Sequence, residues 1–599
     1  MASRRLATAF GLLVLALLAT SRPERVGDAR EYLAMAMNMA SLGPPALSQA
    51  DIARVELQCD QLHIAGTPLT IPALGGSDGR QDFFHFWFYP ALAVPLMWLA
   101  EAAGLNPNLG FVALNVLMLM GALWIASRRA AWWVVAVTFC GPVLWWINKT
   151  HTEVFTFSLL AIAGVVMRDA PWWAMVCLGA AATQNPPVAS LVALVGGTAP
   201  LWRRGVWRDA RFWIGAAAAT ALVVIHPLYY LSRLGVPNPQ LLGGVEPRVP
   251  TLEELGAVIW DPNVGLIFQA PLFCLAVLAA AAVLAMRPRA WVRSPEVWLA
   301  LAGTCLFLVS FSQTPNVNHG GTPGLSRYAV WLVALALPVL QCAAGAMSPS
   351  SQIRFVPLAL ASCLWCVVAF HPALPERYKA PTRAASVIWE RWPWLDEPLP
   401  EVFAERVSGE EPGLIPAATA GCSKVLLAGG VWPVPCFPQP VPAVCRAHES
   451  LCYANRADGC YSFVPLAPRA SYAFDRQRQR TWVWSEDPAS PVQKTLARLH
   501  WPDLRRVSQG APGAVVRATW NVSWTYGLQS DRELLVYMAR PQRDASVTLR
   551  LPGPMAGSLF DPEAGDEIRA VWVDTQPWDL TVVPVPPGRA LVLILFQVR

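Results

Sequence analysis

The most regular feature of the chain is a series of apolar segments separated by short polar or basic stretches. A helix needs about 20 apolar residues to cross a bilayer upright, and several segments are shorter, so we expect some to be tilted, broken or re-entrant. The pattern predicts a mainly α-helical, polytopic membrane protein. The segments lie near 6–20, 86–103, 110–126, 131–147, 154–167, 172–184, 187–201, 212–230, 265–286, 296–312, 328–346 and 354–370.

The pattern changes at about residue 371, where Pro, Gly and charged residues become more frequent and no long apolar run follows. Further on, short alternating runs separated by Gly, Pro and Asp predict an antiparallel β-sandwich. The clearest of these runs are 534–537, 546–549, 569–573 and 590–595.

Three regions are therefore predicted. Residues 1–370 form a transmembrane domain whose first external loop, 21–85, contains amphipathic helices. Residues 371–470 form a Pro-rich, Cys-bearing external region, and residues 471–599 form the external β-sandwich-like domain.

Composition supports a membrane protein. The 599 residues are 54% hydrophobic and 14% charged, with a mean hydropathy of +0.37, whereas soluble domains carry about 25% charged residues. The 28 Trp suit the aromatic belts of a membrane interface. The net charge of +6 is small and comes mainly from Arg in short loops, so it indicates orientation rather than nucleic-acid binding.

Basic residues predict the orientation, because cytoplasmic loops are rich in Arg and Lys. Arg clusters at 128–129, 203–211 and 287–293, together with Arg354, mark cytoplasmic loops. The N-terminal apolar run after Arg4 and Arg5 is expected to be an uncleaved helix rather than a signal peptide, because no small-x-small cleavage site follows it. This places 21–85, 148–153, 231–264, 313–327 and everything after about 371 outside.

Twelve full crossings would leave both termini on the same side, so one segment is expected not to cross. The charges are consistent from residue 128 onward, which places the irregularity between 21 and 127. Either 86–103 or 110–126 does not cross fully, or the two form one broken unit, leaving about 11 true spans. We expect a bacterial inner-membrane protein with a cytoplasmic N-terminus and a periplasmic C-terminal domain.

Six cysteines fall in the regions placed outside, and an even set in an oxidising compartment predicts disulfides. A zinc site is the rival interpretation, but the spacings from Cys445 to Cys452 to Cys460 lack a CxxC knuckle. Cys363 and Cys366 do have that spacing, but within an apolar helix we interpret them as packing. The disulfide candidates are Cys59, Cys422, Cys436, Cys445, Cys452 and Cys460.

Asp28 stands just outside the first apolar segment, at the head of an amphipathic helix. A carboxylate beside hydrocarbon costs free energy unless something offsets it, which makes such acids candidates for function. Tyr32 lies four residues later, on the same helix face. The competing interpretation is that Asp28 merely caps the helix N-terminus.

Other candidates share the predicted external face. Glu153 follows a short turn, where a solvated acid is the simpler interpretation, and His85 and Tyr89 open the segment at 86–103. His226 closes the segment at 212–230, and for each His interfacial packing is favoured over a catalytic base.

A Gly-rich turn at 320–324 leads into Arg327 and Tyr328. Backbone N–H groups in such a turn and an Arg at a membrane surface suit a phosphate. The alternative is an Arg that extends to the interface.

Together these motifs resemble the GT-C class of integral-membrane glycosyltransferases, which includes the aminoarabinose and protein O-mannosyl transferases. The resemblance covers the first 370 residues and depends on motif order. It consists of Asp28-x3-Tyr32-x3-Ala36-x6-Gly43, the Tyr89-Pro90 helix start, Asn115, Thr152-Glu153, the loops 229–237 and 261–266, and the Arg327-Tyr328 pair. Many members carry adjacent acids in the first loop, whereas Asp28 and Glu31 are separated here, so a divalent metal requirement stays open.

The resemblance implies transfer of a sugar from a polyprenyl-phosphate donor to a glycan, lipid or protein acceptor at the external membrane face, with inversion at the anomeric carbon. Asp28 would be the general base and Glu153 would orient the acceptor or assist. Arg327, with His226, would stabilise the departing phosphate. Substrate contacts are expected from Tyr32, Glu31, His85, Tyr89 and Tyr328.

Two alternatives stay open. One is a non-enzymatic transporter, flippase or assembly scaffold with an external binding domain, although such proteins more often show ionisable residues at mid-helix and internal duplication. The other is a family member that binds a lipid-linked sugar without transferring it. The C-terminal turn at 560–565 weakly resembles small domains of carbohydrate-active enzymes and would serve glycan contact or act as a structural cap.

Overall fold

The structure is a computed structural model in which the chain divides into two compact units. The first unit contains residues 1–241 and 245–378, and the second contains 242–244 and 379–599. The described residues are 2–61, 74–76, 78–243, 249–250, 252–313, 324–391, 395, 396, 399, 402 and 406, followed by the backbone of the strands between 424 and 597.

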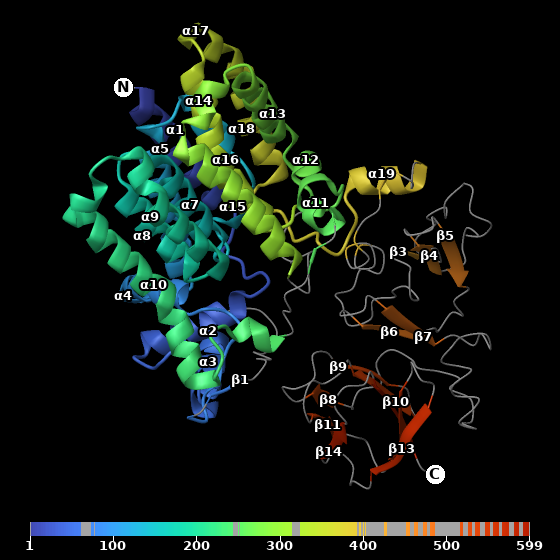
Figure 1. Ribbon diagram of the computed structural model, residues 1–599. Helices are drawn as coiled ribbons and strands as arrows, with labels where there is room; N and C mark the ends of the chain where they lie inside the picture. Colours follow the sequence, from blue (N-terminus) through green and yellow to red (C-terminus); the bar gives the residue numbers. More distant parts are fainter. Residues whose placement is uncertain are drawn as a thin grey trace. The chain divides into compact units, whose positions relative to one another are not determined.

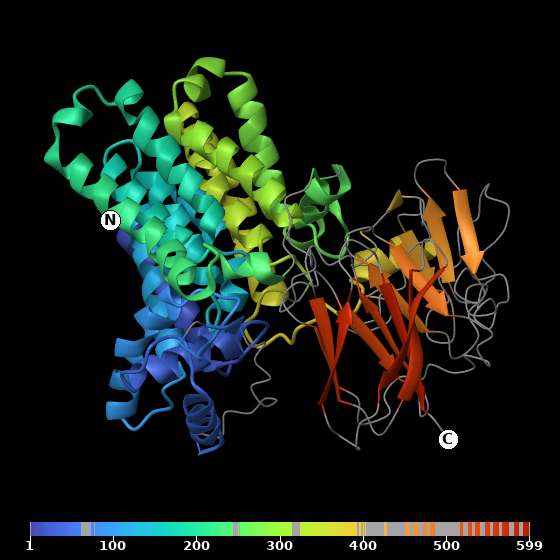
Figure 2. The same ribbon diagram turned by 60° about the horizontal axis from the view of Figure 1, so that its bottom comes forward.

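Helices dominate the first unit, and both views show the longer ones packed side by side (Figure 1, Figure 2). The α-helices are α1 (Ala2–Ala19), α2 (Ala29–Ala40), α3 (Gln49–Gln61), α4 (Phe88–Ala102), α5 (Leu109–Ser127), α6 (Trp132–Phe139), α7 (Glu153–Val166), α8 (Pro171–Ala182), α9 (Ala189–Trp202), α10 (Ala210–Leu234), α11 (Leu252–Trp260), α12 (Leu266–Gln269), α13 (Pro271–Ala285), α14 (Pro288–Val292), α15 (Pro295–Ser312), α16 (Ala329–Ala346), α17 (Pro349–Gln352) and α18 (Val356–Ala369). The short 3-10 helices are η1 (Pro142–Trp146), η2 (Pro186–Val188), η3 (Val206–Arg208), η4 (Pro239–Gly243) and η5 (Ile353–Phe355).

Within the described part of the chain, five helical stretches are long and apolar enough to cross a membrane by length and composition. They are α5, α10, α15, α16 and the stretch Pro349–Ala369 that joins α17 to α18. Six further apolar helices are shorter, at 10–17 residues. The chain is therefore a mostly helical protein with membrane-spanning helices, and the expected total of about 11 spans stays a prediction.

The predicted segments at 86–103 and 110–126 form two separate helices, α4 and α5. The segment at 131–147 is less regular, because α6 ends at Phe139 and the 3-10 helix η1 follows from Pro142. Proline after a short helix cannot donate the next backbone hydrogen bond, which explains the break. This break does not decide which segment fails to cross, so the expected non-crossing segment between 21 and 127 stays a prediction.

Helix α7 lies at the centre of the bundle and packs against α5, α8 and α16. Small residues allow close approach: a Cβ on Gly164 would meet Pro338 at 2.7 Å, and one on Gly179 of α8 would meet the Ala219 backbone of α10 at 2.9 Å. Small residues at helix crossings are the usual way to pack helices within a membrane. The central position of α7 holds its first residue, Glu153, in a buried environment.

The polar stretch between α1 and α4, called here the 20–87 segment, contains α2, α3 and a two-stranded antiparallel sheet of β1 (Leu74–Gly75) and β2 (Gln81–Asp82). Residues 62–73 and 77 lie outside the described part. Helix α2 packs on α4, with the ring of Tyr32 edge-on to Tyr89 at 5.8 Å. The expected amphipathic helices of this segment therefore correspond to α2 and α3.

The first unit continues to residue 378, beyond the predicted boundary at 370. The backbone explains the extension, because Trp145 Nε1 donates to the Leu374 carbonyl at 2.9 Å and Lys149 Nζ donates to the Pro372 carbonyl at 2.6 Å. Both donors lie in the buried connection between α6 and α7. Residues 371–378 are thus held to the helical unit rather than starting the next region.

The second unit contains α19 (Arg383–Arg391) and antiparallel strands in several sheets. Two sheets, in the orders β13-β12-β15-β10-β9 and β14-β11-β8, include the strand runs expected in 471–599. Their side chains lie outside the described part, so the sandwich stays a prediction. The strands are β3 (Lys424–Leu427), β4 (Leu451–Asn455), β5 (Cys460–Val464), β6 (Ser471–Asp475), β7 (Arg480–Trp484), β8 (Val515–Ala518), β9 (Thr525–Gln529), β10 (Glu533–Met538), β11 (Ala545–Arg550), β12 (Met555–Asp561), β13 (Asp566–Val573), β14 (Leu580–Val585) and β15 (Leu591–Gln597).

Candidate functional site

Asp28 occupies the N-cap position of α2, but its side chain makes no capping hydrogen bond. Instead, its Oδ2 atom lies 2.6 Å from Nη1 of Arg327 and 3.1 Å from Nε2 of His85. A third contact, at 3.4 Å, is to Nε2 of His151. A helix cap needs a side chain that accepts from the first-turn amides, so the capping interpretation of Asp28 does not describe this side chain.

The three contacts converge on one oxygen of the Asp28 carboxylate. The other oxygen, Oδ1, makes no hydrogen bond or ion pair with any residue that the structure describes, and the side chain keeps 22% of its surface exposed. A carboxylate oxygen has lone pairs that accept hydrogen bonds. One oxygen of Asp28 is therefore anchored, and the other keeps its lone pairs free of any described donor.

His85 is held at four points. Its ring Nδ1 lies 2.9 Å and its backbone N–H 3.2 Å from Oε2 of Glu31, and its carbonyl accepts from Tyr230 Oη at 3.1 Å. With Nε2 on Asp28, both ring nitrogens face carboxylates, which accept and cannot donate. Burial alone would lower the pKa of His85, but the charges and hydrogen bonds of Asp28 and Glu31 raise it to about 10. His85 is thus an imidazolium at neutral pH.

Glu153 and His151 form the opposite wall of the cluster. His151 Nδ1 lies 3.2 Å from Glu153 Oε1 and 3.1 Å from the Thr152 amide nitrogen. Glu153 is 1% exposed, and its Oε1 lies 3.9 Å from Nε of Arg327. Glu153 Oε2 and Arg327 Nε are both buried without a hydrogen-bond partner in the described part of the chain. A bound group or ordered water would normally satisfy such atoms.

The charges and hydrogen bonds around Asp28 make its carboxyl group strongly acidic. Burial is the largest single influence and would raise the pKa of Asp28, but the charges of Arg327 and His85 and the hydrogen bonds from His151 and His85 act in the opposite direction. Together they hold the pKa of Asp28 well below its ordinary value. Asp28 is therefore ionised at any physiological pH.

Several predicted residues form the floor of the cluster. The Tyr32 ring lies edge-on to His85 and His151, each at 5.6 Å, and is 3% exposed. Tyr89 is fully buried and donates its hydroxyl to Asn115 Oδ1 at 3.0 Å. Asn115 in turn donates to the Lys149 carbonyl at 2.8 Å. These contacts orient the connection that carries His151 rather than forming an open surface.

Tyr328 follows Arg327 at the start of α16. Its ring stacks on Phe311 at 4.7 Å and lies at the same distance from Trp331. Nη2 of Arg327 lies 3.5 Å from the Tyr328 hydroxyl. Tyr328 therefore restricts the guanidinium to the side that faces Asp28.

His226 is not brought into the cluster. It is 2% exposed and stacks on Phe86 at 5.0 Å and on Trp87 at 4.9 Å. No polar contact joins it to Asp28 or Arg327 among the described residues. The interfacial-packing interpretation of this His therefore matches its surroundings better than a role on the departing phosphate.

His151 is the cluster member that the sequence reasoning did not select. The sequence did offer a clue to this residue. His151 lies two residues before Glu153, in a turn predicted to lie on the same membrane face as Asp28. Gly27 helps to bring these groups together: its φ is +51°, and a Cβ there would lie 3.6 Å from His151 Nε2 and 3.7 Å from Arg327 Nη1. The positive φ would strain any other residue, while the two contacts are at ordinary van der Waals distance.

A divalent metal does not fit the anchored oxygen of Asp28. The Arg327 guanidinium lies 2.6 Å from Oδ2, where a metal cation would have to bind. The described residues contain no group of three or more His, Cys, Asp or Glu arranged to hold a metal ion. We therefore derive no chemical step through a metal.

Some predicted features lie wholly or partly outside the described residues. The Gly-rich turn is described only from Gly324, and Cys422, Cys436 and Cys445 are not described. For Cys452 and Cys460 only the strand backbone is described. Cys59 lies in α3, with its Sγ 3.8 Å from the Met37 sulfur. The external disulfides therefore stay a prediction.

The sequence matches no protein-family model and no curated protein. Among solved structures it is similar to an arabinofuranosyltransferase, AftD, from Mycobacteria, at 11% identity and a TM-score of 0.29. The similarity covers 92% of this chain and 57% of that one, so the chain spans little more than half of its length. A TM-score this low does not establish a common fold, and the function proposed below depends on the site alone.

Proposed function

We propose that the protein transfers a sugar from a polyprenyl-phosphate donor to a hydroxyl acceptor, with Asp28 as general base. The observation that carries the proposal is the state of the Asp28 carboxylate, which has one oxygen anchored by Arg327, His85 and His151 and the other without a hydrogen bond or ion pair to the described residues. The anchored oxygen orients the group, and the second oxygen can accept a proton. This arrangement at one end of a bundle of apolar helices supports chemistry on a lipid-linked substrate.

In the proposed reaction the acceptor oxygen attacks the anomeric carbon while the bond from that carbon to the phosphate oxygen breaks. The bonding electrons leave with the phosphate, and the acceptor proton passes to Oδ1 of Asp28. Attack from the side opposite the leaving group inverts the anomeric configuration. General-base catalysis of this kind contributes about 10²–10⁴-fold.

Arg327 is proposed to bind the donor phosphate. Among the described residues its buried Nε has no hydrogen-bond partner, and its guanidinium can hold two phosphate oxygens at once. As the phosphate draws the guanidinium away from Asp28, the carboxylate loses its strongest cationic neighbour and its pKa rises. Donor binding would thereby make Asp28 a stronger base.

The remaining predicted roles follow from the same arrangement. Glu153 orients His151 and balances the charge of Arg327, and Glu31 holds His85. The acceptor is a glycan, lipid or protein hydroxyl, and the site lies at the periplasmic face of the inner membrane. The C-terminal unit is proposed to lie on that same side, with its disulfides.

The test is sugar transfer from a panel of radiolabelled polyprenyl-phosphate monosaccharides to total membrane glycolipid, with purified protein in detergent. Asp28→Asn should lower the transfer rate by at least about 100-fold. Asp51→Asn is a matched control, because Asp51 lies in the same 20–87 segment, has a similar side-chain exposure of 20% and pairs with Arg80 and Arg54. That control should stay within about twofold of the unmodified protein.

Transfer by Asp28→Asn at the unmodified rate would refute the assignment of the base. Glu153→Gln provides a second variant, expected to reduce transfer by a smaller factor because Glu153 acts through His151. Each variant is compared only where gel filtration shows the same monodisperse profile. A full panel without transfer by the unmodified protein would refute the donor class.

A further inference from the structure

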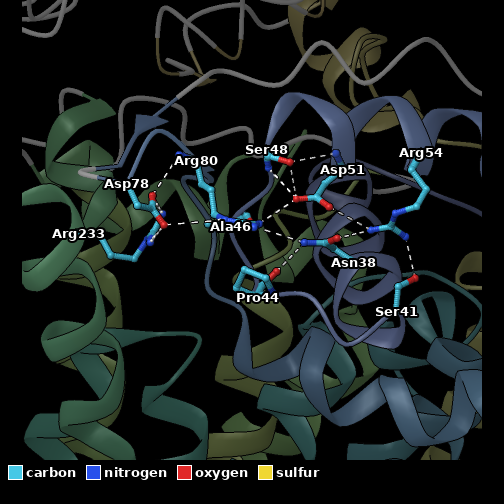
Figure 3. A network of polar contacts seen from close by, with 10 residues as sticks. All are labelled: Asn38, Ser41, Pro44, Ala46, Ser48, Asp51, Arg54, Asp78, Arg80 and Arg233. Carbon is cyan, nitrogen blue, oxygen red and sulfur yellow. Dashed lines mark hydrogen bonds and ion pairs between the residues drawn. The ribbon is translucent and has the colours of Figure 1, made fainter.

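The C-terminal end of α10 reaches the 20–87 segment and binds the strand that leads to His85 (Figure 1). Arg233 Nε donates to Oδ2 of Asp82 at 2.8 Å, and both of its Nη atoms bind Asp78 at 2.8 Å. Tyr229 Oη donates to Oδ1 of Asp82 at 2.9 Å. Figure 3 shows the paired contacts between Arg233 and Asp78.

The next residue of α10 acts on His85 directly. Tyr230 is 1% exposed, and its hydroxyl donates to the His85 carbonyl at 3.1 Å. Asp82, only three residues before His85, is 2% exposed. One turn of α10 thus forms hydrogen bonds with both ends of the four-residue stretch 82–85.

The strand needs such support because it is short. Strand β2 has only two residues. On the side away from β1 it makes a single bridge, in which Leu47 and Gln81 exchange backbone hydrogen bonds of 2.8 and 2.9 Å. A two-stranded sheet of this size is not stable on its own. Side-chain contacts from outside the sheet must therefore decide where residues 82–85 lie.

We propose that the end of α10, through Tyr230 and Arg233, is a positioning device that holds the His85 imidazole against Asp28. This inference adds positioning residues to the proposed base and rests on the proposed function only for their effect on transfer. His85 contacts Asp28 at 3.1 Å and Glu31 at 2.9 Å. A displacement of about 1 Å would break both contacts, and such displacements can cost about 100-fold in rate.

The charged groups around His85 set its pKa, and this pKa can therefore be used to detect a displacement of the ring. Asp28 and Glu31 from α2 contact the ring, Arg327 and His151 share the Asp28 oxygen, and the paired Asp82 and Arg233 lie on the side of α10. Two adjacent carboxylates stabilise the imidazolium, so moving the ring away from them should return its pKa towards the ordinary value of 6.5. The protonation of His85 therefore reports its position without any substrate.

The experiment is histidine-selective NMR on the full chain in detergent micelles, with the His85 signal among the 8 His assigned through its loss in His85→Gln. Tyr230→Phe removes one hydroxyl without changing the packing volume. It should lower the pKa of His85 by at least about one unit. Arg233→Ala should also lower it, and Arg233→Lys, which keeps one donor for Asp82, should restore part of the difference.

Arg80→Ala is the control. It breaks the Arg80–Asp51 pair of the same segment, 2.8 Å long and also visible in Figure 3, and a longer ion pair of 4.0 Å with Asp78, but it leaves the contacts of Asp82 and His85 with α10 in place. In the Arg80→Ala variant, the pKa of His85 should match that in the unmodified protein. A lowered melting temperature in Tyr230→Phe with an unchanged His85 pKa would overturn the inference, because a purely structural contact behaves in that way.

Transfer assays separate this inference from the proposed function. If the protein transfers sugar, Tyr230→Phe should reduce kcat more than KM and alter the pH profile, because it disturbs the base rather than donor binding. If no transfer is found but the His85 pKa shifts, the positioning role stands and the enzymatic proposal fails. If transfer is found but the pKa of His85 does not shift, the enzymatic proposal stands and the positioning role fails.

Discussion

Two carboxylates of the 20–87 segment, Asp28 and Asp82, are each paired with an Arg from a distant helix end, yet their environments differ. Both oxygens of Asp82 are occupied, one by Arg233 at 2.8 Å and the other by Tyr229 at 2.9 Å, and the residue is 2% exposed. Asp28 makes all of its charged contacts through one oxygen, and its side chain is 22% exposed.

The difference separates a structural carboxylate from one available for chemistry. A buried carboxylate that accepts a protein hydrogen bond on each oxygen stabilises a fold but has no oxygen free of a protein donor. A carboxylate with one anchored oxygen keeps its orientation and can still accept a proton. Pairing with Arg therefore does not distinguish the two roles, whereas the count of occupied oxygens does.

The largest expected difference concerns the two Arg partners. Arg327→Ala should reduce sugar transfer by about 10²–10³-fold, because it removes the proposed donor to the departing phosphate. Arg233→Ala should reduce it by a smaller factor, about tenfold, because Arg233 acts only through the position of His85. Parallel initial-rate assays over a range of donor concentrations check this order. Equal losses of transfer in the two variants would contradict the difference proposed between Asp28 and Asp82.

The second expected difference concerns stability. Asp82→Asn removes a charged, buried acceptor from Arg233 and Tyr229, so it should lower the free energy of unfolding by about 1–3 kcal/mol. Asp51→Asn, which removes a half-exposed pair, should lower it by at most about 1 kcal/mol. Differential scanning fluorimetry in one detergent ranks the two variants, and a greater loss in Asp51→Asn would contradict the structural role of Asp82.

The smallest effect is a pH dependence that belongs to the Asp28 cluster alone. The pKa of His85 is raised to about 10 in the folded protein, above its ordinary value of 6.5. Its contribution to stability is therefore complete below about pH 6.5 and is lost as the pH rises through about 10. The melting temperature should fall over this window, and the fall should be shallower in His85→Gln. Equal slopes in the two proteins would show that His85 does not carry this charge.

Much of the site could be predicted because membrane topology is encoded locally. Apolar runs and Arg-rich loops are enough to group Asp28, His85, Glu153 and Arg327 on one face. The same reasoning included His226, because a residue's place near the end of an apolar segment does not reveal which way its helix turns. Only the packing of α10 directs that ring towards Phe86 and Trp87.

The role of Asp28 illustrates what local sequence leaves open. An Asp before an amphipathic helix suits a cap and a base equally well, and the choice depends on a residue 299 positions away. The break at 131–147 is a milder case, since Gly141 and Pro142 stand in the sequence, but the apolar pattern alone predicts one continuous segment there.

The sequence by itself determined that the chain is a helical membrane protein, where its apolar segments lie, and which ionisable residues stand at their ends. These properties follow from hydrophobicity and from charge near the helix ends, both of which are read over a few residues. Only the tertiary structure decided that Asp28 is anchored through one oxygen, that His151 joins the cluster and that α10 holds His85. Each of these depends on contacts between residues far apart in the chain, whose geometry is set by the packing of the helices that carry them.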